Sequence, residues 1–151
     1  MTWLFNIFRR WWKKRIERQF LQCLQSEIAK EFLRLLLKLM SLALKGDEKF
    51  RRNIKGFRGR YQFRSVDNSV TVAAVFTGKG LEVKETLLPD ADVSIIFKDS
   101  KSLMKYLLAT DRDILRLLLN NKVVVKGNMN YMFKFEYMAN HLQLVLTQRR
   151  W

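Results

Sequence analysis

The side chains that most often carry out chemistry in enzymes are few in this sequence and lie far apart. His141 is the only histidine and Cys23 the only cysteine among the 151 residues. Nucleophilic catalysis needs a nucleophile and a base within hydrogen-bonding reach, and no serine stands in the sequence context of a nucleophile elbow. We therefore predict that the protein is not an enzyme and that both residues are ordinary helix residues.

Carboxylate pairs could act as general acids and bases, and the closest such pairs are Asp90 with Asp92 and Asp111 with Asp113. Each pair flanks a predicted turn or helix start, where a carboxylate caps backbone N–H groups without any catalytic role. The sequence contains no His-Glu-x-x-His, no Cys-x-x-Cys, no Walker-type phosphate loop and no Gly-x-Gly-x-x-Gly. We expect no metal ion and no cofactor.

Positive charge is concentrated in the first part of the chain. Residues 1–60 contain sixteen Lys and Arg against five Asp and Glu, which gives +11 of the total net charge of +15. Aromatic residues accompany these cations near the amino terminus, a composition typical of a helix that lies among lipid headgroups. We predict that this segment binds an anionic membrane surface through Trp3, Phe8, Arg9, Arg10, Trp11, Trp12, Lys13, Lys14 and Arg15.

Two alternative roles would involve the same residues. Nucleic acid would be bound by the same cations together with Arg58, Arg60 and Arg64 beside Tyr61, but no recognised nucleic-acid-binding motif frames them, so this partner is disfavoured. Alternatively, the aromatic stripe packs on the domain itself or on a second copy, which would give a homodimer through the N-terminal helices.

The order of the first residues argues against export. An apolar start runs into a basic cluster, the reverse of a secretion signal. The most apolar stretch, residues 32–44, is shorter than the roughly 20 residues of a membrane span and contains Arg34 and Lys38. A single cysteine gives no sign of an oxidising compartment. We expect a cytoplasmic protein that is peripheral on the inner membrane surface.

The first 45 residues contain no proline or glycine, and apolar residues recur three or four apart in a stripe that ends with Leu24, Ile28 and Phe32. This spacing predicts helices over residues 2–24 and 27–45, with an interruption where Ser26 could cap the second helix. A polar, basic linker or frayed turn is expected over residues 47–58. We therefore divide the chain into a basic amphipathic N-terminal helix, residues 1–26, and a domain over residues 27–151.

From Gly59 onward the apolar period changes to two. Strands separated by turn residues are expected near residues 61–64, 70–76 and 81–87, forming an antiparallel meander, and then over 93–97 and 122–126. Asp99 should cap a helix, and Thr110 with Asp113 a shorter one. The last segment alternates like a strand but exceeds twenty residues, so its length favours a helix capped by Asn128.

Three stretches of this second half, residues 91–97, 99–108 and 123–129, resemble the sterol-carrier-protein lipid-binding domain. The resemblance covers about residues 27–148. It implies an α+β fold in which a five-stranded mixed sheet, a three-stranded antiparallel meander plus two further strands, is covered by helices. It also implies a tunnel for fatty acyl chains, phospholipids, sterols or isoprenoids. Some bacterial proteins with this domain are accessory carriers in isoprenoid quinone synthesis, which makes a quinone precursor one candidate ligand.

This chain departs from the family pattern at residues 117–121, which lack the glycine-bearing turn of many relatives, and in its long basic amino terminus. Methionine is flexible and polarizable and adapts to irregular ligands. We predict that an internal apolar cavity is lined by Phe76, Phe97, Met104, Leu108, Met129, Met132, Phe135 and Met138. The predicted function is non-catalytic binding and transfer or presentation of a lipid. The alternative is a membrane-associated scaffold or protein-interaction module in which the same residues fill a closed core.

Overall fold

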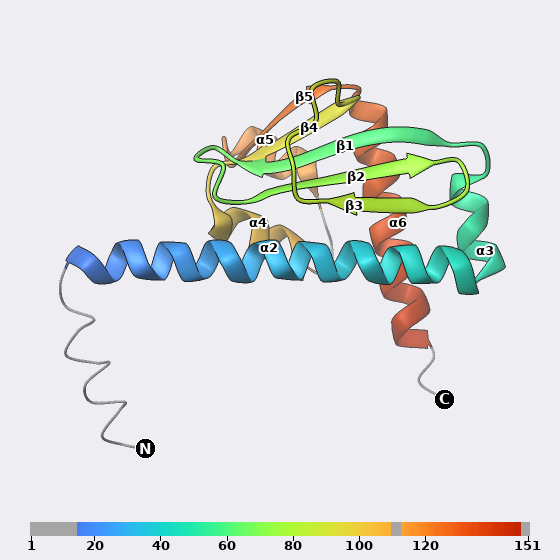
Figure 1. Ribbon diagram of the computed structural model, residues 1–151, viewed down its shortest axis with the longest axis horizontal. Helices are drawn as coiled ribbons and strands as arrows, with labels where there is room; N and C mark the ends of the chain where they lie inside the picture. Colours follow the sequence, from blue (N-terminus) through green and yellow to red (C-terminus); the bar gives the residue numbers. More distant parts are fainter. Residues whose placement is uncertain (1–14, 110–112, 149–151) are drawn as a thin grey trace, which may run out of the picture.

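The computed structural model describes the backbone of residues 15–109 and 113–148, and the side chains of residues 25–109 and 113–144. A sheet lies over a long helix, α2, which runs along the length of the molecule, while α6 crosses α2 steeply (Figure 1). In chain order the elements are α2 (Arg15–Gly46), α3 (Glu48–Arg51), the 3-10 turn η1 (Arg52–Ile54), β1 (Arg58–Ser65), β2 (Thr71–Thr77), β3 (Leu81–Lys84), β4 (Val93–Phe97), α4 (Ser100–Leu108), α5 (Ile114–Leu119), β5 (Val123–Gly127) and α6 (Met129–Gln148).

The sheet has five strands in the order β3-β2-β1-β4-β5. The first three strands form an antiparallel meander, β4 pairs with β1 in parallel, and β5 pairs with β4 antiparallel. The α+β class and the five-stranded mixed sheet are therefore confirmed. The third strand is shorter than expected, because β3 ends at Lys84 and the chain then crosses toward β4.

Residues opposite one another in the strand registers share a face, since side chains alternate along each strand. Tyr61 is paired with Ala74 on one side and Val93 on the other, and all three are fully buried. Together with their neighbours they form the inner face, which the helices cover. The inner face comprises Tyr61, Phe63, Val72, Ala74, Phe76, Leu81, Val93, Ile95, Phe97 and Val123 among its buried members.

The outer face of the sheet is partly covered by the segment that connects β3 to β4. The Leu88 backbone N–H donates to Oε1 of the buried Gln62 at 2.6 Å. Arg60 forms an ion pair with Asp90 at 3.0 Å, and its backbone N–H donates to a carboxylate oxygen of Asp92 at 2.8 Å. This connection therefore passes over β1 and reaches β4 on its far side.

The helix α2 is continuous through Ser26, so the predicted interruption at that residue is wrong. Ser26 is buried and its hydroxyl hydrogen-bonds the hydroxyl of Ser69 at 2.9 Å, so the side chain is satisfied without ending the helix. The expected domain boundary at residue 26 falls inside this helix. The buried face of α2 consists of Ala29, Leu33, Leu37, Met40 and Leu44, spaced three or four apart.

Residues 47–58 are not simply a linker or frayed turn, because residues 48–54 form α3 and η1. Asp47 caps α3 by accepting a hydrogen bond from the Phe50 backbone N–H at 3.1 Å. Phe50 and Ile54 are buried and belong to the hydrophobic core. Because the stretch is mostly polar, its sequence did not indicate that Phe50 and Ile54 attach it to the domain.

The predicted hairpin turn at Asp67 and Asn68 and the predicted caps Asp99 and Asn128 are confirmed. In the β1–β2 hairpin Asn68 has φ +59°, and hydrogen bonds from Ser65 and Ser69 lower the pKa of Asp67. Asp99 caps α4 by accepting from the Ser102 backbone N–H at 2.7 Å. Asp113 was predicted to lie in the first turn of a helix capped by Thr110, but it is itself the N-cap of α5, which begins at Ile114. Asn128 accepts a hydrogen bond from the first turn of α6, and the last segment is a helix, as its length indicated. Thr110, the other half of the predicted capping box, lies outside the described residues.

Candidate ligand-binding site

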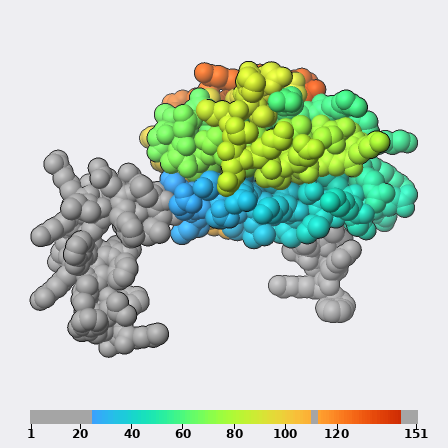
Figure 2. Space-filling model, viewed as in Figure 1, coloured from blue at the N-terminus to red at the C-terminus, as the bar shows by residue number. Residues whose placement is uncertain are grey.

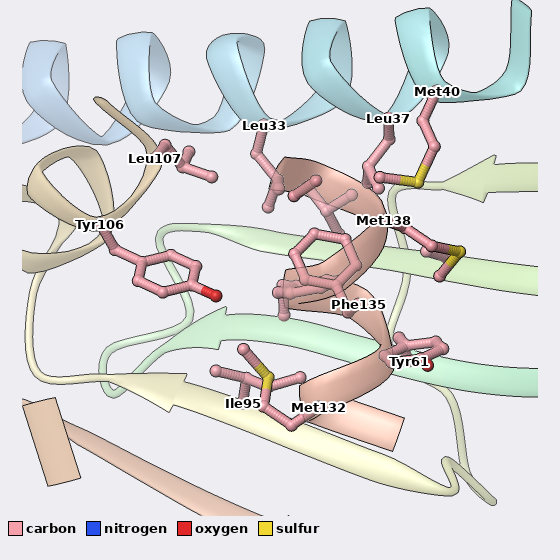
Figure 3. Close-up of a cluster of buried hydrophobic side chains, with 14 of the residues drawn as sticks. Leu33, Leu37, Met40, Tyr61, Ile95, Tyr106, Leu107, Met132, Phe135 and Met138 are labelled. Atoms are coloured by element: carbon pink, nitrogen blue, oxygen red, sulfur yellow. The ribbon is translucent and has the colours of Figure 1, made fainter. Parts of the chain in front are cut away.

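The predicted cavity residues converge between the inner face of the sheet and the helices α2 and α6. The sheet contributes Phe76 and Phe97, and α6 contributes Met132, Phe135 and Met138; all five are at most 2% exposed. The three from α6 repeat every third residue and face the strands and α2 (Figure 3). The structure thus brings together side chains that are up to 62 positions apart, from Phe76 to Met138.

The other three predicted residues lie at the edge of this cluster or outside it. Met104 and Met129 are half-buried and pack against the core. Leu108 is 59% exposed, so the structure does not place it in the interior, contrary to expectation. The inward positions of α4 are taken by Leu103, Tyr106 and Leu107; the latter two lie three and four residues after the first, so all three share one helix face.

Sequence reasoning missed the contribution of α2. Leu33, Leu37 and Met40 are fully buried and point toward Phe135 and Met138 (Figure 3). The apolar stripe that predicted the helix ran through Ile28 and Phe32, and this is a different face. The signal for the buried face was the second series, in which Leu33, Leu37, Met40 and Leu44 also recur three or four apart.

Aromatic rings form a continuous group within the interior. The Phe63 and Phe135 ring centroids are 4.9 Å apart, and Tyr61 lies 6.0 Å from Phe135 and 5.4 Å from Phe76. Phe57, half-buried in the loop before β1, extends the group outward by contacting Phe76 at 5.5 Å. Tilted and edge-to-face pairs of this kind stabilise the interior beyond simple burial of area.

Polar atoms reach this interior with their hydrogen bonds satisfied. The Tyr61 hydroxyl donates to the Tyr131 carbonyl at 2.7 Å, and burial raises the pKa of Tyr61, with smaller contributions from Tyr131 and Asp92. Tyr61 is therefore a neutral donor at physiological pH. Glu136 accepts from the Tyr106 hydroxyl at 3.0 Å and from the Ile114 backbone N–H at 2.8 Å, which joins α6 to α4 and α5. Such an interior offers apolar contact rather than acid–base chemistry.

The candidate chemical residues have structural contacts instead. The Asn53 amide donates to Nδ1 of His141 at 3.0 Å, and the His141 ring lies 5.1 Å from the Phe50 ring. Asp90 and Asp92 bind Arg60, as described above. Asp111 and the Cys23 side chain lie outside the described part of the chain.

Among the described side chains, those of residues 25–109 and 113–144, His, Cys, Asp and Glu nowhere gather in a group of three that could hold a metal ion. Within residues 15–109 and 113–148, no helix combines the length and the apolar character needed to cross a membrane.

Most of the predicted membrane-binding residues, Trp3 to Lys14, lie outside the described residues. The last of them, Arg15, is the first residue of α2, and its side chain is not described. The structure therefore does not test the membrane prediction.

The strand order and the helices over one face are those of the sterol-carrier-protein fold. The expected resemblance is confirmed at the level of fold by solved structures. One is described as "UbiJ-SCP2 Ubiquinone synthesis protein", with TM-score 0.56 and 18% identity over 76% of this chain and 95% of that one. Sterol carrier protein 2 of Yarrowia lipolytica aligns with TM-score 0.51 and 16% identity over 71% and 88% of the two chains. Sterol carrier protein domain 2 of Helicoverpa armigera aligns with TM-score 0.50 and 19% identity over 70% and 84%. No protein-family model and no curated protein matches the sequence.

Proposed function

We propose that the protein binds a lipid or isoprenoid between the sheet and the helices α2 and α6, and transfers or presents it without chemical change. The observation that carries the proposal is the set of fully buried, adaptable side chains in this place: Met40, Met132 and Met138 around Phe135. The fold supports the same function, because three similar structures are sterol carrier or ubiquinone synthesis proteins by name.

The energetics of such an interior suit a long apolar chain. Each CH₂ group removed from water contributes about 0.8 kcal/mol, so an acyl or prenyl chain binds without polar contacts if side chains rearrange around it. Methionine has three rotatable bonds and is well suited to this rearrangement. Fatty acyl chains and isoprenoids share this chemistry. The ubiquinone synthesis protein among the similar structures supports an isoprenoid quinone precursor as one candidate.

We expect protein purified without detergent to retain apolar lipid. Native mass spectrometry should show a mass above that of the 18.1 kDa chain, and organic extraction should release the ligand. A fluorescent acyl or prenyl probe should bind the lipid-free protein saturably. If neither bound lipid nor saturable probe binding is found, the interior is a closed core, and the scaffold function replaces the carrier function.

We also propose that residues 1–24 attach the protein to the cytoplasmic surface of a membrane. Each basic residue near an anionic surface contributes about 1 kcal/mol, so six such residues outweigh a few kcal/mol of lost rigid-body freedom. Three of the four tryptophans also lie here. Attachment of this kind is reversible and sensitive to salt.

Reversing four charges of this segment should abolish binding to anionic vesicles in a sedimentation assay. The variant replaces Arg9, Arg10, Lys13 and Lys14 with Glu in the full chain. A control with the same change in net charge replaces the exposed residues Lys79, Lys101, Lys105 and Lys126 with Glu. Equal loss of binding in both variants would show that overall charge, rather than the amino-terminal segment, determines attachment.

A further inference from the structure

The outward face of α2 carries large apolar side chains that nothing in the described structure covers. Ile28, Leu35 and Leu42 are 57%, 54% and 63% exposed. They are seven residues apart, which is close to two helical turns, so they form a straight stripe about 21 Å long. Half-buried Phe32 and Leu39 lie between them along one side. In Figure 2 the part of α2 whose side chains are described forms a blue-to-cyan band along the body of the molecule.

The charges beside the stripe differ from those of the amino-terminal segment. Residues 25–46 contain four Lys and Arg and two Glu, a net +2. Lys30 pairs with Glu27 at 3.2 Å, and Arg34 pairs with Glu31 at 2.8 Å and with Glu85 at 3.1 Å. A nearly neutral flank does not attract an anionic surface strongly, and it permits contact with another protein. An exposed stripe of this kind marks an interaction site.

The stripe is symmetric about Leu35. Consider a two-fold axis that passes between two copies of the helix beside Leu35. It places position 28 of one copy opposite position 42 of the other, so each exposed residue of the stripe meets an exposed residue. Glu31 and Lys38 lie on the same side of the stripe, on exposed positions seven residues apart. That separation, about 10.5 Å along the axis, is too long for a contact within one helix. In an antiparallel pair with Leu35 opposite Leu35, position 31 of one copy lies within one residue, along the helix axis, of position 38 of the other copy.

We infer that α2 is a homodimer interface, in which a second copy of this chain packs its α2 antiparallel with Leu35 against Leu35, Ile28 against Leu42, and Glu31 beside Lys38. This surface is distinct from the lipid site and does not depend on the proposed function. A single helix face buries less area than a standard interface of about 800 Å² per partner. We therefore expect a dimer that dissociates at low concentration, with a Kd on the order of micromolar.

The first experiment measures the oligomeric state of the full chain by analytical ultracentrifugation from roughly 1 to 100 μM, a range that brackets the expected Kd. The native protein should move from monomer to dimer, and Leu35→Glu should remain a monomer with an unchanged thermal unfolding curve. The matched control is Leu119→Glu, because Leu119 is 83% exposed on α5, and this variant should dimerise like the native protein. A monomeric native protein, or equal dissociation by both substitutions, would overturn the proposal.

A charge-swap series tests the register. Glu31→Lys and Lys38→Glu should each raise the dimer Kd roughly tenfold, because each places like charges together. The double variant should restore most of the affinity. A double variant as weak as the single ones would rule out the antiparallel arrangement.

A vesicle assay separates this surface from membrane contact. The dimer should persist at about 0.5 M NaCl, where adsorption to anionic vesicles declines. Leu35→Glu should leave vesicle binding unchanged. A monomeric native protein whose vesicle binding is lost on Leu35→Glu would assign the stripe to the membrane and overturn the dimer.

Discussion

Gly127→Ala should lower the free energy of unfolding by at least about 3 kcal/mol, because the substitution adds backbone strain and a steric overlap. Gly127 ends β5 with φ +106°, a backbone conformation that residues with a Cβ rarely adopt. A Cβ at this position would overlap the carbonyl oxygen of Asp92. That oxygen accepts a hydrogen bond from the Asn128 backbone N–H at 2.9 Å, so moving it away would break the turn into α6.

Urea unfolding of the lipid-free protein would measure this effect. The matched control is Gly80→Ala, because a Cβ at Gly80 has no atom within 4 Å and the same change should shift the free energy by less than about 0.5 kcal/mol. Indistinguishable midpoints for the two variants would show that the segment around Asp92 gives way, and that the turn after β5 is not rigid.

Phe135→Ala should weaken lipid binding at least tenfold while costing less stability than an equivalent change elsewhere in the core. The comparison is Phe50→Ala, since both phenylalanines are 0% exposed but Phe50 packs against His141, outside the proposed site. Truncating a close-packed phenylalanine costs about 3–5 kcal/mol. A side chain beside space that a ligand occupies has fewer permanent contacts to lose, so its truncation costs less.

Both free energies must be measured on lipid-free protein, because bound lipid stabilises the folded state by mass action. Probe titration then gives the affinity of each variant, and Met132→Ala should behave like Phe135→Ala. If Phe135→Ala unfolds the protein as severely as Phe50→Ala and leaves the lipid stoichiometry unchanged, Phe135 belongs to a closed core.

The strands and turns could be predicted because their signals are local. Alternation around Tyr61 and Val72 indicated half-buried strands, and Asn68 suited the left-handed backbone of the hairpin. The pairing of β4 with β1 had no local signal, since Val93 meets Tyr61 from 32 positions away. The resemblance of residues 91–97 and 123–129 to a known domain implied a mixed five-stranded sheet, but it did not identify which strands pair in parallel.

The predictions that failed depended on distant contacts. The sequence predicted that Ser26 caps a helix, but its hydroxyl instead hydrogen-bonds Ser69, which lies 43 residues later in the chain. Tyr106 turns inward because its hydroxyl reaches Glu136, 30 residues later, which leaves Leu108 on the outside. In α2 apolar residues occupy more than one face, so periodicity predicted the helix but could not identify the side that faces the sheet.

The single parallel pairing in the sheet also determines the order in which the interior can form. The β1–β2–β3 meander consists of neighbours in sequence and can form as soon as residues 58–84 are free to fold. Joining β4 to β1 closes a longer loop, whose entropic cost must be met before the contact is gained. Met132 and Phe135 lie on α6, which follows β5 in the chain, so the interior around them can be enclosed only once residues beyond 129 are available to pack on the sheet.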